Sequence, residues 1–316
     1  MSRPPETAAN QPGTSDRPAG QPQPLWHPLH AAHERRFEEL RFVYPVLSRR
    51  SAGLSIGVNL NPDKICNFDC IYCQVDRRTE SDTRFVETDA MLAELEAVLD
   101  CALSGVIYEM PKFAATPLHL RRVNDIAFSG DGEPTTHRNF AEIVAACAQV
   151  KRQLEARYQA PAIKMVLITN ASMFHRPHVQ QGLALLDAND GEIWGKLDAG
   201  TDAYYQKIER TKIPFAQVLS NLTEAAKVRP IVIQSLFMRV GGEAPGEAEL
   251  LAYCDRLNEN VAAGGQIKLV QVYTVARRPA ESYVAALSDG EVDAIAALVQ
   301  QRCQLPTAAY YGNPTP

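Results

Sequence analysis

The chain has 316 residues, of which 46% are hydrophobic and 22% are charged, and these proportions exclude a wholly disordered, collagen-like or coiled-coil protein. Its 32 basic and 37 acidic side chains give a net charge of −5, so no overall positive field is available to hold nucleic acid. No segment approaches the roughly 20 consecutive apolar residues of a membrane-spanning helix, and seven unevenly placed cysteines favour a reducing, cytoplasmic environment over a secreted disulfide framework.

The first 50 residues divide into two segments. Residues 1–25 are rich in Pro, Gln, Thr and Ser and have few apolar side chains, which predicts a disordered leader. Residues 26–50 are basic and amphipathic, which predicts a helical lead-in that passes into an extended connection. We expect one domain over residues 51–305, followed by a short C-terminal tail over residues 306–316.

Within that domain, apolar β-branched runs alternate with segments of helical period. Six strands, each followed by a helix, predict a parallel sheet with right-handed crossovers, as in an open doubly wound sheet or a barrel. The predicted strands are Leu54–Leu60, Val123–Ser129, Ile163–Thr169, Glu192–Asp198, Ile231–Met238 and Ile267–Val275. The predicted helices are Thr88–Leu103, Phe140–Tyr158, His178–Leu186, Phe215–Val228, Glu247–Asn258 and Gly290–Cys303.

The carboxyl ends of parallel strands are where function collects in both architectures. The first predicted strand is followed by Cys66, Cys70 and Cys73, spaced C-x3-C-x2-C. Thiolates are soft ligands suited to iron–sulfur clusters or zinc, and no fourth Cys or His lies at the usual short spacing. We therefore expect an open iron–sulfur site that can bind a substrate or cofactor. The alternative is a structural zinc site completed by a distant histidine.

These three cysteines, together with Tyr72, match the C-x3-C-x-aromatic-C signature of the radical S-adenosylmethionine (SAM) enzymes. A second motif of that family, of Gly-Gly-Glu type, is similar to Gly130–Pro134 (GDGEP) at the second predicted strand, with Asp131 where the first glycine often stands. The resemblance extends from about Leu54 to Val275. It implies a partial (βα)6 barrel, TIM-like and of the radical SAM type.

Within this superfamily, one branch looks especially similar. The segments IGVNLNPDKICNFDCIYCQ, AFSGDGEPTTH, LITNAS, KLDAG and VYTVARRPAE resemble iron–sulfur oxidoreductases related to wyosine base formation in tRNA. Enzymes of that branch carry a second cluster whose cysteines precede the radical motif, whereas residues 1–65 of this chain contain no cysteine. The branch favours RNA as substrate, while the missing cysteines and the acidic charge favour a different substrate.

The resemblance implies a [4Fe-4S] cluster on the three cysteines, with SAM as the second cofactor. Reductive cleavage of SAM would give methionine and a 5′-deoxyadenosyl radical, which abstracts hydrogen from an unidentified substrate, and a partner such as flavodoxin or ferredoxin would supply the electron. The residues expected to bind the cofactor are Tyr72, Gly130, Asp131, Gly132, Glu133, Asn170, Ser172, Lys196, Asp198, Gln234 and Tyr273.

Several of these residues have a more specific expected role. The family pattern places Tyr72 at the adenine, and lets the backbone at the two glycines approach the methionine amino group because glycine has no side chain. Lys196 and Asp198 would meet the methionine carboxylate and the ribose, or would simply form a buried ion pair at a strand end. Periodicity does not decide which face of the sheet Gln234 and Tyr273 occupy.

Three functions remain open from the sequence. The first is a radical enzyme that modifies RNA or a nucleoside, and the second is a radical enzyme that acts on a protein, peptide or small metabolite. The third is a non-enzymatic iron–sulfur or zinc-binding sensor. The other four cysteines, Cys101, Cys147, Cys254 and Cys303, occupy apolar helical contexts and are expected to pack as small hydrophobic residues.

Pairs of arginines raise a related question about the substrate. Arg77-Arg78 follow the cysteine motif and Arg277-Arg278 follow the sixth predicted strand, so both pairs are expected on the rim of the site. They would serve either as a patch for a phosphate-bearing substrate or as scattered solubilising charge.

Overall fold

The computed structural model describes residues 40–48 and 50–312. The predicted leader over residues 1–25 lies outside the described residues, as does the part of the predicted helical lead-in that precedes residue 40. The described end of that lead-in forms strand β1 (Val43–Ser48), at the place where an extended connection is expected.

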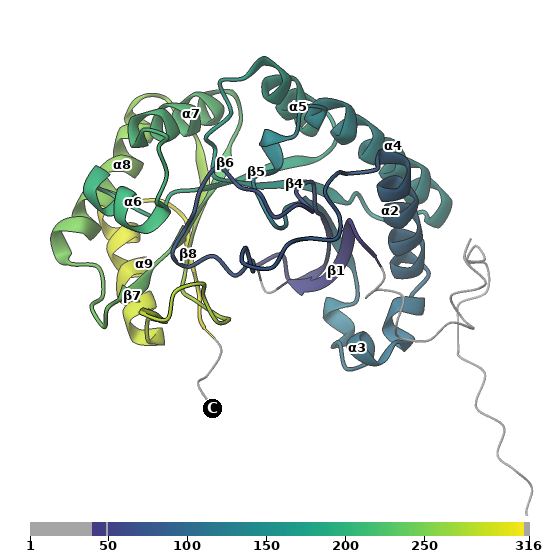
Figure 1. Ribbon diagram of the computed structural model, residues 1–316, viewed down its shortest axis with the longest axis horizontal. Helices are drawn as coiled ribbons and strands as arrows, with labels where there is room; N and C mark the ends of the chain where they lie inside the picture. The colour runs from purple at the N-terminus through teal and green to yellow at the C-terminus, as the bar shows by residue number, and fades with distance from the viewer. Residues whose placement is uncertain (1–39, 49, 313–316) are drawn as a thin grey trace, which may run out of the picture.

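A sheet curled into a half-barrel forms the centre of the fold (Figure 1). Among the described residues it has eight strands in the order β1-β2-β3-β4-β5-β6-β8-β10, and all neighbours are parallel except β1 and β2. The six predicted strands lie side by side in chain order, which confirms the predicted partial barrel. They are β2 (Gly53–Val58), β3 (Val123–Phe128), β4 (Lys164–Thr169), β5 (Gly191–Lys196), β6 (Ile231–Leu236) and β8 (Ile267–Tyr273).

Helices cover the convex side of this curved sheet (Figure 1). All six predicted helices are present, and α3 and α6 are additional ones. The helical period of the sequence does not reveal them because they span only four and eight residues. The helices are α2 (Thr88–Leu103), α3 (Pro111–Ala114), α4 (Phe140–Tyr158), α5 (Pro177–Asp187), α6 (Asp202–Glu209), α7 (Phe215–Val228), α8 (Glu247–Ala262) and α9 (Asp289–Cys303).

The two faces of the sheet bury different sets of side chains, because successive residues of a strand point to opposite sides. Facing the helices, residues such as Phe128 and Leu167 belong to the large hydrophobic core. The alternate residues form a second, smaller apolar cluster on the concave side, made of Ala127, Val166, Trp194 and Val232. This cluster forms the floor beneath the polar residues that end the strands.

The sheet is one strand longer at each end than the six-strand pattern predicts. At one edge, β1 pairs antiparallel with β2, and the ring of Tyr44 lies against Gly57, where an added Cβ would come within 2.2 Å of that ring. At the other edge, β10 (Thr307–Tyr310) pairs in parallel with β8, within the residues expected to be a tail. In strands this short, polar and apolar residues alternate too few times for the sequence pattern to distinguish a strand from an irregular connecting segment.

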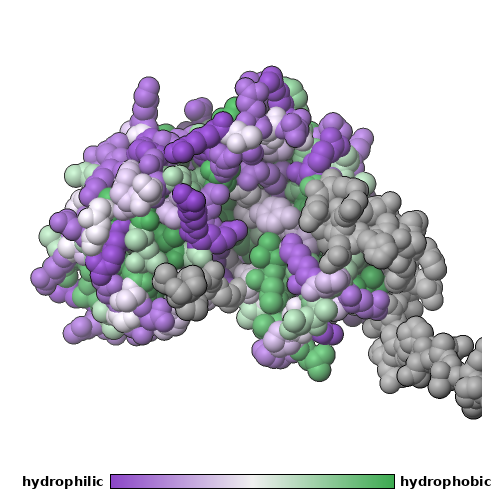
Figure 2. Space-filling view, turned by 60° about the horizontal axis from the view of Figure 1, so that its bottom comes forward, coloured by the Kyte–Doolittle hydropathy of each residue, from purple (hydrophilic) through white to green (hydrophobic). Residues whose placement is uncertain are grey.

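The half-barrel remains open between its two edge strands, at the bottom of Figure 1. Figure 2 turns this side toward the viewer and shows a hollow with both hydrophilic and hydrophobic residues around it. The segment after β8 leads to β9 (Val284–Ala286). This strand pairs antiparallel with β7 (Met238–Val240), which follows β6, and the two form a small separate sheet. Among the described residues, no helix combines the length and apolar character needed to cross a membrane.

Candidate functional site

The three cysteines lie in an irregular segment after β2, residues 61–74, here called the cysteine loop. Its middle is held by backbone bonds from the end of α6: the Asp69 amide donates to the Glu209 carbonyl at 3.0 Å, and the Ile71 amide donates to the Ile208 carbonyl at 2.9 Å. A loop without its own regular hydrogen bonds needs such partners to keep one conformation. The helix that sequence pattern does not predict is therefore the support of the cysteine loop.

Side chains and backbone beyond α6 add to this support. Thr211 donates its hydroxyl to the Asn67 carbonyl at 2.9 Å, and Arg210 Nε donates to the Asp69 carbonyl at 2.7 Å. From the other side, the amide of Ala280, in the segment after β8, donates to the Cys73 carbonyl at 2.7 Å. The loop is thus clamped between two segments that lie far from it in sequence.

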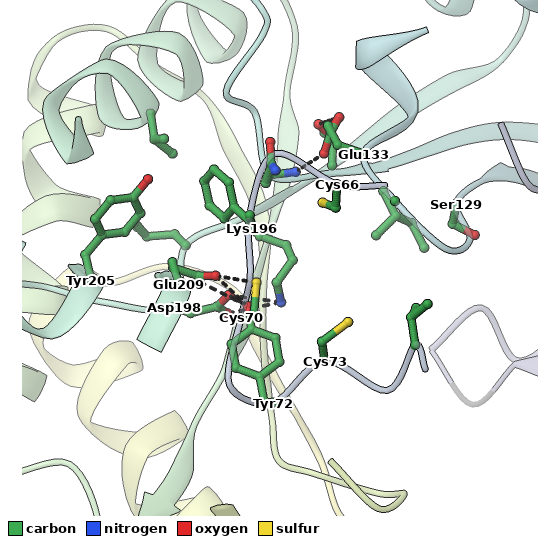
Figure 3. Close-up of a pocket in the computed structure, with 18 of the residues that line it drawn as sticks. Cys66, Cys70, Tyr72, Cys73, Ser129, Glu133, Lys196, Asp198, Tyr205 and Glu209 are labelled. Carbon is green, nitrogen blue, oxygen red and sulfur yellow. Dashed lines mark hydrogen bonds and ion pairs between the residues drawn. The ribbon is translucent and has the colours of Figure 1, made fainter. Parts of the chain in front are cut away.

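The three thiols line one cavity of about 200 Å³ at the carboxyl ends of the strands (Figure 3). Within residues 40–48 and 50–312, no three Cys, His, Asp or Glu side chains are grouped as the ligands of a single ion would be. Thiolates that bind separate irons of one cluster do not need to meet at a point. Predicted residues on the other walls are Tyr72, Gly130, Gly132, Glu133, Asn170, Lys196 and Asp198.

Cys70 has an acidic partner that the sequence analysis missed. Its Sγ donates to Glu209 Oε2 at 2.6 Å, and Glu209 is only 3% exposed. Burial, together with nearby Asp198, raises the pKa of Glu209 to about 8. Burial and the adjacent Glu209 also raise the pKa of the Cys70 thiol well above its ordinary value. The Cys70 thiol is therefore protonated at neutral pH and must release its proton before it can bind a metal.

A basic residue faces another cysteine. Arg77 places Nη2 3.5 Å from Cys73 Sγ and also donates to the backbone carbonyl of Lys64. Burial alone would lower the pKa of Arg77, but the thiols of Cys73 and Cys66 outweigh it and raise that pKa. Arg77 is therefore directed into the site, whereas Arg78, Arg277 and Arg278 are exposed and do not line the cavity.

The glycine turn, Gly130–Gly132, packs directly against the start of the cysteine loop. An added Cβ at Gly130 would lie 2.4 Å from Asn59 Oδ1, and one at Gly132 would lie 2.3 Å from the Ile65 carbonyl oxygen. Both distances are far inside ordinary contact. Glycine is thus required here for the approach of two protein segments, in addition to the backbone approach to SAM that the family resemblance implies.

Glu133 connects the glycine turn to the end of β4. Its buried carboxylate accepts hydrogen bonds from Thr135 Oγ1 at 2.5 Å, from Thr169 Oγ1 at 2.6 Å and from the Asn170 amide at 2.7 Å. Burial raises its pKa, and these hydrogen bonds partly offset that rise. Although Glu133 borders the cavity, most of its hydrogen-bonding capacity is used inside the protein.

Asn170 and Ser172, which follow β4, are connected to the cysteine loop through Asn67. Asn170 Nδ2 donates to Asn67 Oδ1 at 2.8 Å, and Asn67 Nδ2 donates to Ser172 Oγ at 2.8 Å. Asn170 lines the cavity, whereas Ser172 is fully buried behind it. The three side chains therefore fix the distance between the cysteine loop and the carboxyl end of β4.

Asp198 lies at the centre of a buried polar network after β5. Its carboxylate accepts from Tyr72 OH at 2.5 Å and from the Leu236 amide at 2.7 Å, and it pairs with Lys196 Nζ at 3.1 Å. Lys196 also donates to Tyr273 OH at 2.7 Å. Burial alone would lower the pKa of Lys196, but Asp198 and Tyr273 raise it, so the ammonium group stays charged.

The ion pair between Lys196 and Asp198 that the sequence analysis weighed as an alternative is present, and their contacts to SAM stay a prediction. Gln234 and Tyr273 lie on the concave face, since Gln234 pairs in register with Lys196 and Tyr273 meets its ammonium group. Gln234 donates to Gln271 at 2.8 Å. Four predicted residues do not border the cavity: Asp131, Ser172, Gln234 and Tyr273.

The donor set suits an iron–sulfur cluster. Cys66, Cys70 and Cys73 supply three soft thiol ligands to one cavity, and its described lining contains no further Cys or His. The glycine turn, which packs against the start of the loop, borders the same cavity. Lys196 and Asp198 also border the cavity, and a zwitterionic cofactor such as SAM has groups complementary to their charges.

Comparison with known proteins agrees with this chemistry. Residues 60–243 match the model of the radical SAM superfamily, which is more than half of the chain. A UPF0026 protein of Helicobacter pylori (strain J99) is 28% identical over 190 residues, covering 57% of this chain and 54% of that protein. A protein of Brachyspira hyodysenteriae described as GTPase Obg is 24% identical over 269 residues, covering 83% of this chain.

The chain spans 34% of the Brachyspira protein and about half of the Helicobacter protein. Among solved structures, one described as the crystal structure of archaeal TYW1 matches 78% of this chain and 72% of its own, with a TM-score of 0.43 and 14% identity.

Proposed function

The chain belongs to the radical SAM superfamily, and we propose that it uses a [4Fe-4S] cluster held by Cys66, Cys70 and Cys73 to cleave SAM reductively. When bound, these cofactors supply a 5′-deoxyadenosyl radical that takes hydrogen from the substrate. The observation that carries this proposal is the single cavity that joins the three thiols to the glycine turn and to the ends of β4 and β5.

The residues around the cavity have distinct proposed tasks. The charged Lys196 would attract the carboxylate of SAM, while Asp198 orients both that lysine and Tyr72 through its hydrogen bonds. The backbone at Gly130 and Gly132 is free of side chains and would approach the methionine amino group. Each task is one of binding or orientation, because the reactivity belongs to the cofactors.

An aromatic wall on one side of the cavity would exclude water from the reacting centre. Tyr205 of α6 stacks on Phe215 of α7 with ring centroids 4.8 Å apart, and Phe68 of the cysteine loop meets Tyr205 edge-on at 5.9 Å. All three side chains line the cavity. Aromatic pairs pack with little freedom, so this wall supports a dry site in which a reactive radical survives until it meets its substrate.

Two substrate classes each have an observation in their support. RNA or a nucleoside is supported by the similarity to the wyosine-related branch and by the exposed side chains of Arg78, Arg277 and Arg278. A protein, peptide or small metabolite is supported by the net charge of −5 and by the absence of cysteine from residues 1–65. A flavodoxin or ferredoxin is the proposed electron donor.

Anaerobic reconstitution with iron and sulfide, followed by dithionite and SAM, tests the proposed chemistry. We expect release of 5′-deoxyadenosine and methionine, measured by chromatography with mass detection, and no release from variants in which a loop cysteine is replaced by alanine. Cys147→Ala, which alters a buried thiol outside the cavity, is the matched control and should release both products. Binding of a full cluster without release of either product would count against the proposed enzyme and favour the sensor.

A further inference from the structure

Arg50, in the turn between β1 and β2, places its guanidinium group on the concave side of the half-barrel. Its Cζ lies 5.0 Å from the ring centroid of Tyr273 and 5.8 Å from that of Trp194. Trp194 belongs to the concave apolar cluster, and Tyr273 also accepts a hydrogen bond from Lys196, which lines the cavity of the cysteines. Arg50 is therefore separated from that cavity by a single layer of side chains.

Arg50 differs from the other cations of this region because no carboxylate of the described residues neutralises it. Lys196 pairs with Asp198 at 3.1 Å, and Lys164 pairs with Glu192 at 2.8 Å. For Arg50, neither an ion pair nor a side-chain hydrogen bond to any residue of the described ranges is present, and its contacts are the two aromatic rings. A half-buried guanidinium without a counter-ion is costly, so its position calls for an anion.

The geometry leaves the binding groups of Arg50 available. Ring contacts hold a guanidinium group through its face, whereas its five N–H donors point outward along its edge. Tyr310 of β10, which pairs in register with Tyr273, lies close to Arg50: burial raises the pKa of Tyr310, and the arginine charge lowers it. A fixed planar fork beside phenol hydroxyl groups is suited to bidentate contact with an oxyanion.

We propose that Arg50 is an oxyanion-binding site on the concave face, and that it holds a phosphate or carboxylate group of the substrate. The inference rests on the proposed function only in assigning that anion to the substrate, because the anion site itself follows from the contacts of Arg50. The anion would lie on the concave face, one layer of side chains away from the cavity of the cysteines.

Tryptophan fluorescence tests this site directly, because Trp194 is in contact with Arg50 and the chain has only one other tryptophan, Trp26. The full-length Trp26→Phe protein, without cluster or SAM, is titrated with inorganic phosphate and separately with acetate at constant ionic strength. We expect a saturable change in emission, weakened at least tenfold by Arg50→Gln. Saturation by phosphate alone would identify a phosphate-bearing substrate, and saturation by acetate alone would identify a carboxylate.

Arg41→Gln is the matched control, because Arg41 also lies over an aromatic ring, that of Phe42 at 5.1 Å, but already pairs with Glu87. It should bind the anion as the parent protein does. The proposal is overturned if the parent shows no saturable change with either anion, or if Arg50→Gln binds as tightly as the parent.

If circular dichroism shows that Arg50→Gln is unfolded, Arg50→Lys replaces it. Lysine keeps the charge but lacks the planar fork, so we expect affinity to fall several-fold, and unchanged affinity would overturn the proposal. The titration needs neither the cluster nor SAM, so a negative result would refute the anion site and would not affect the proposal of reductive SAM cleavage. Loss of SAM cleavage with anion binding intact would refute only the proposed function.

Discussion

Replacing Gly132 with alanine should displace the cysteine loop and reduce cluster binding. The new Cβ would lie 2.3 Å from the Ile65 carbonyl oxygen, and 2.6 Å from Asn61 Cβ. These distances are roughly 1 Å inside ordinary contact, so either the glycine turn or the loop must move by about that amount. Overpacking of this kind costs about 1–3 kcal/mol. Because Ile65 directly precedes Cys66, the shift would be passed to the first thiol.

The assay is iron content per protein after anaerobic reconstitution, combined with urea unfolding of the unreconstituted protein. We expect Gly132→Ala to bind less than half the iron of the wild type. Gly182→Ala creates a comparable clash, 2.4 Å from the Phe140 ring, far from the loop, and Gly246→Ala meets nothing within 4 Å. The first control should lose stability but keep its iron, and the second should lose neither. Equal iron in Gly132→Ala and Gly246→Ala would refute the reasoning.

Further predictions address the loop, its clamp and the base of the sheet. Alanine at any one loop cysteine should abolish iron and sulfide binding, whereas Cys147→Ala should leave the iron content unchanged. Thr211→Val removes the bond to the Asn67 carbonyl, so urea unfolding should show a loss of about 1 kcal/mol and reconstitution should show lower iron content; unchanged iron content would contradict the clamp. Burial raises the pKa of Glu192, but bonds from two lysines outweigh it and lower that pKa below 4.5. The ionised Glu192 carboxylate therefore contributes its full stabilisation to the folded protein above pH 4.5, and this contribution is lost as pH falls through the folded-state pKa. Glu192→Gln should cost about 1 kcal/mol at pH 7 in urea unfolding, and its difference from wild type should shrink below pH 4.5; a pH-independent difference would contradict this assignment.

The fold was predictable where burial imposes a long, regular pattern. The helices Thr88–Leu103, Phe140–Tyr158 and Phe215–Val228 begin and end where the sequence predicts, because each buries one apolar stripe against the sheet. In contrast, α6 has eight residues and only two turns of pattern. Its clearest local signal is Thr201, which precedes it and accepts a hydrogen bond from the Tyr204 amide at 3.2 Å.

The site was predictable where residues of one short motif act together. The three thiols and the glycine turn do border one cavity, as the strand order requires. Glu209 was not predictable, because it ends the helix that the pattern misses and because a single glutamate resembles any surface residue. Nothing in the local sequence shows that it lies 2.6 Å from Cys70. Arg50 was likewise not predictable as part of a site, and the sequence pattern assigned it to the lead-in. Its ring contacts are with β5 and β8, which lie far from it in sequence.

The residues that sequence pattern identifies and those it misses differ in how they are held. Periodicity reports burial, and because burial is shared among many side chains, the pattern stays recognisable when one position departs from it. The cysteine loop is instead held by single polar contacts from distant segments, such as those of Glu209, Thr211 and Ala280. Removing one such contact leaves the half-barrel and its helices intact but frees part of the loop. Substitutions in this clamp should therefore change cluster binding more than they change the free energy of unfolding, which is the opposite of what core substitutions should do.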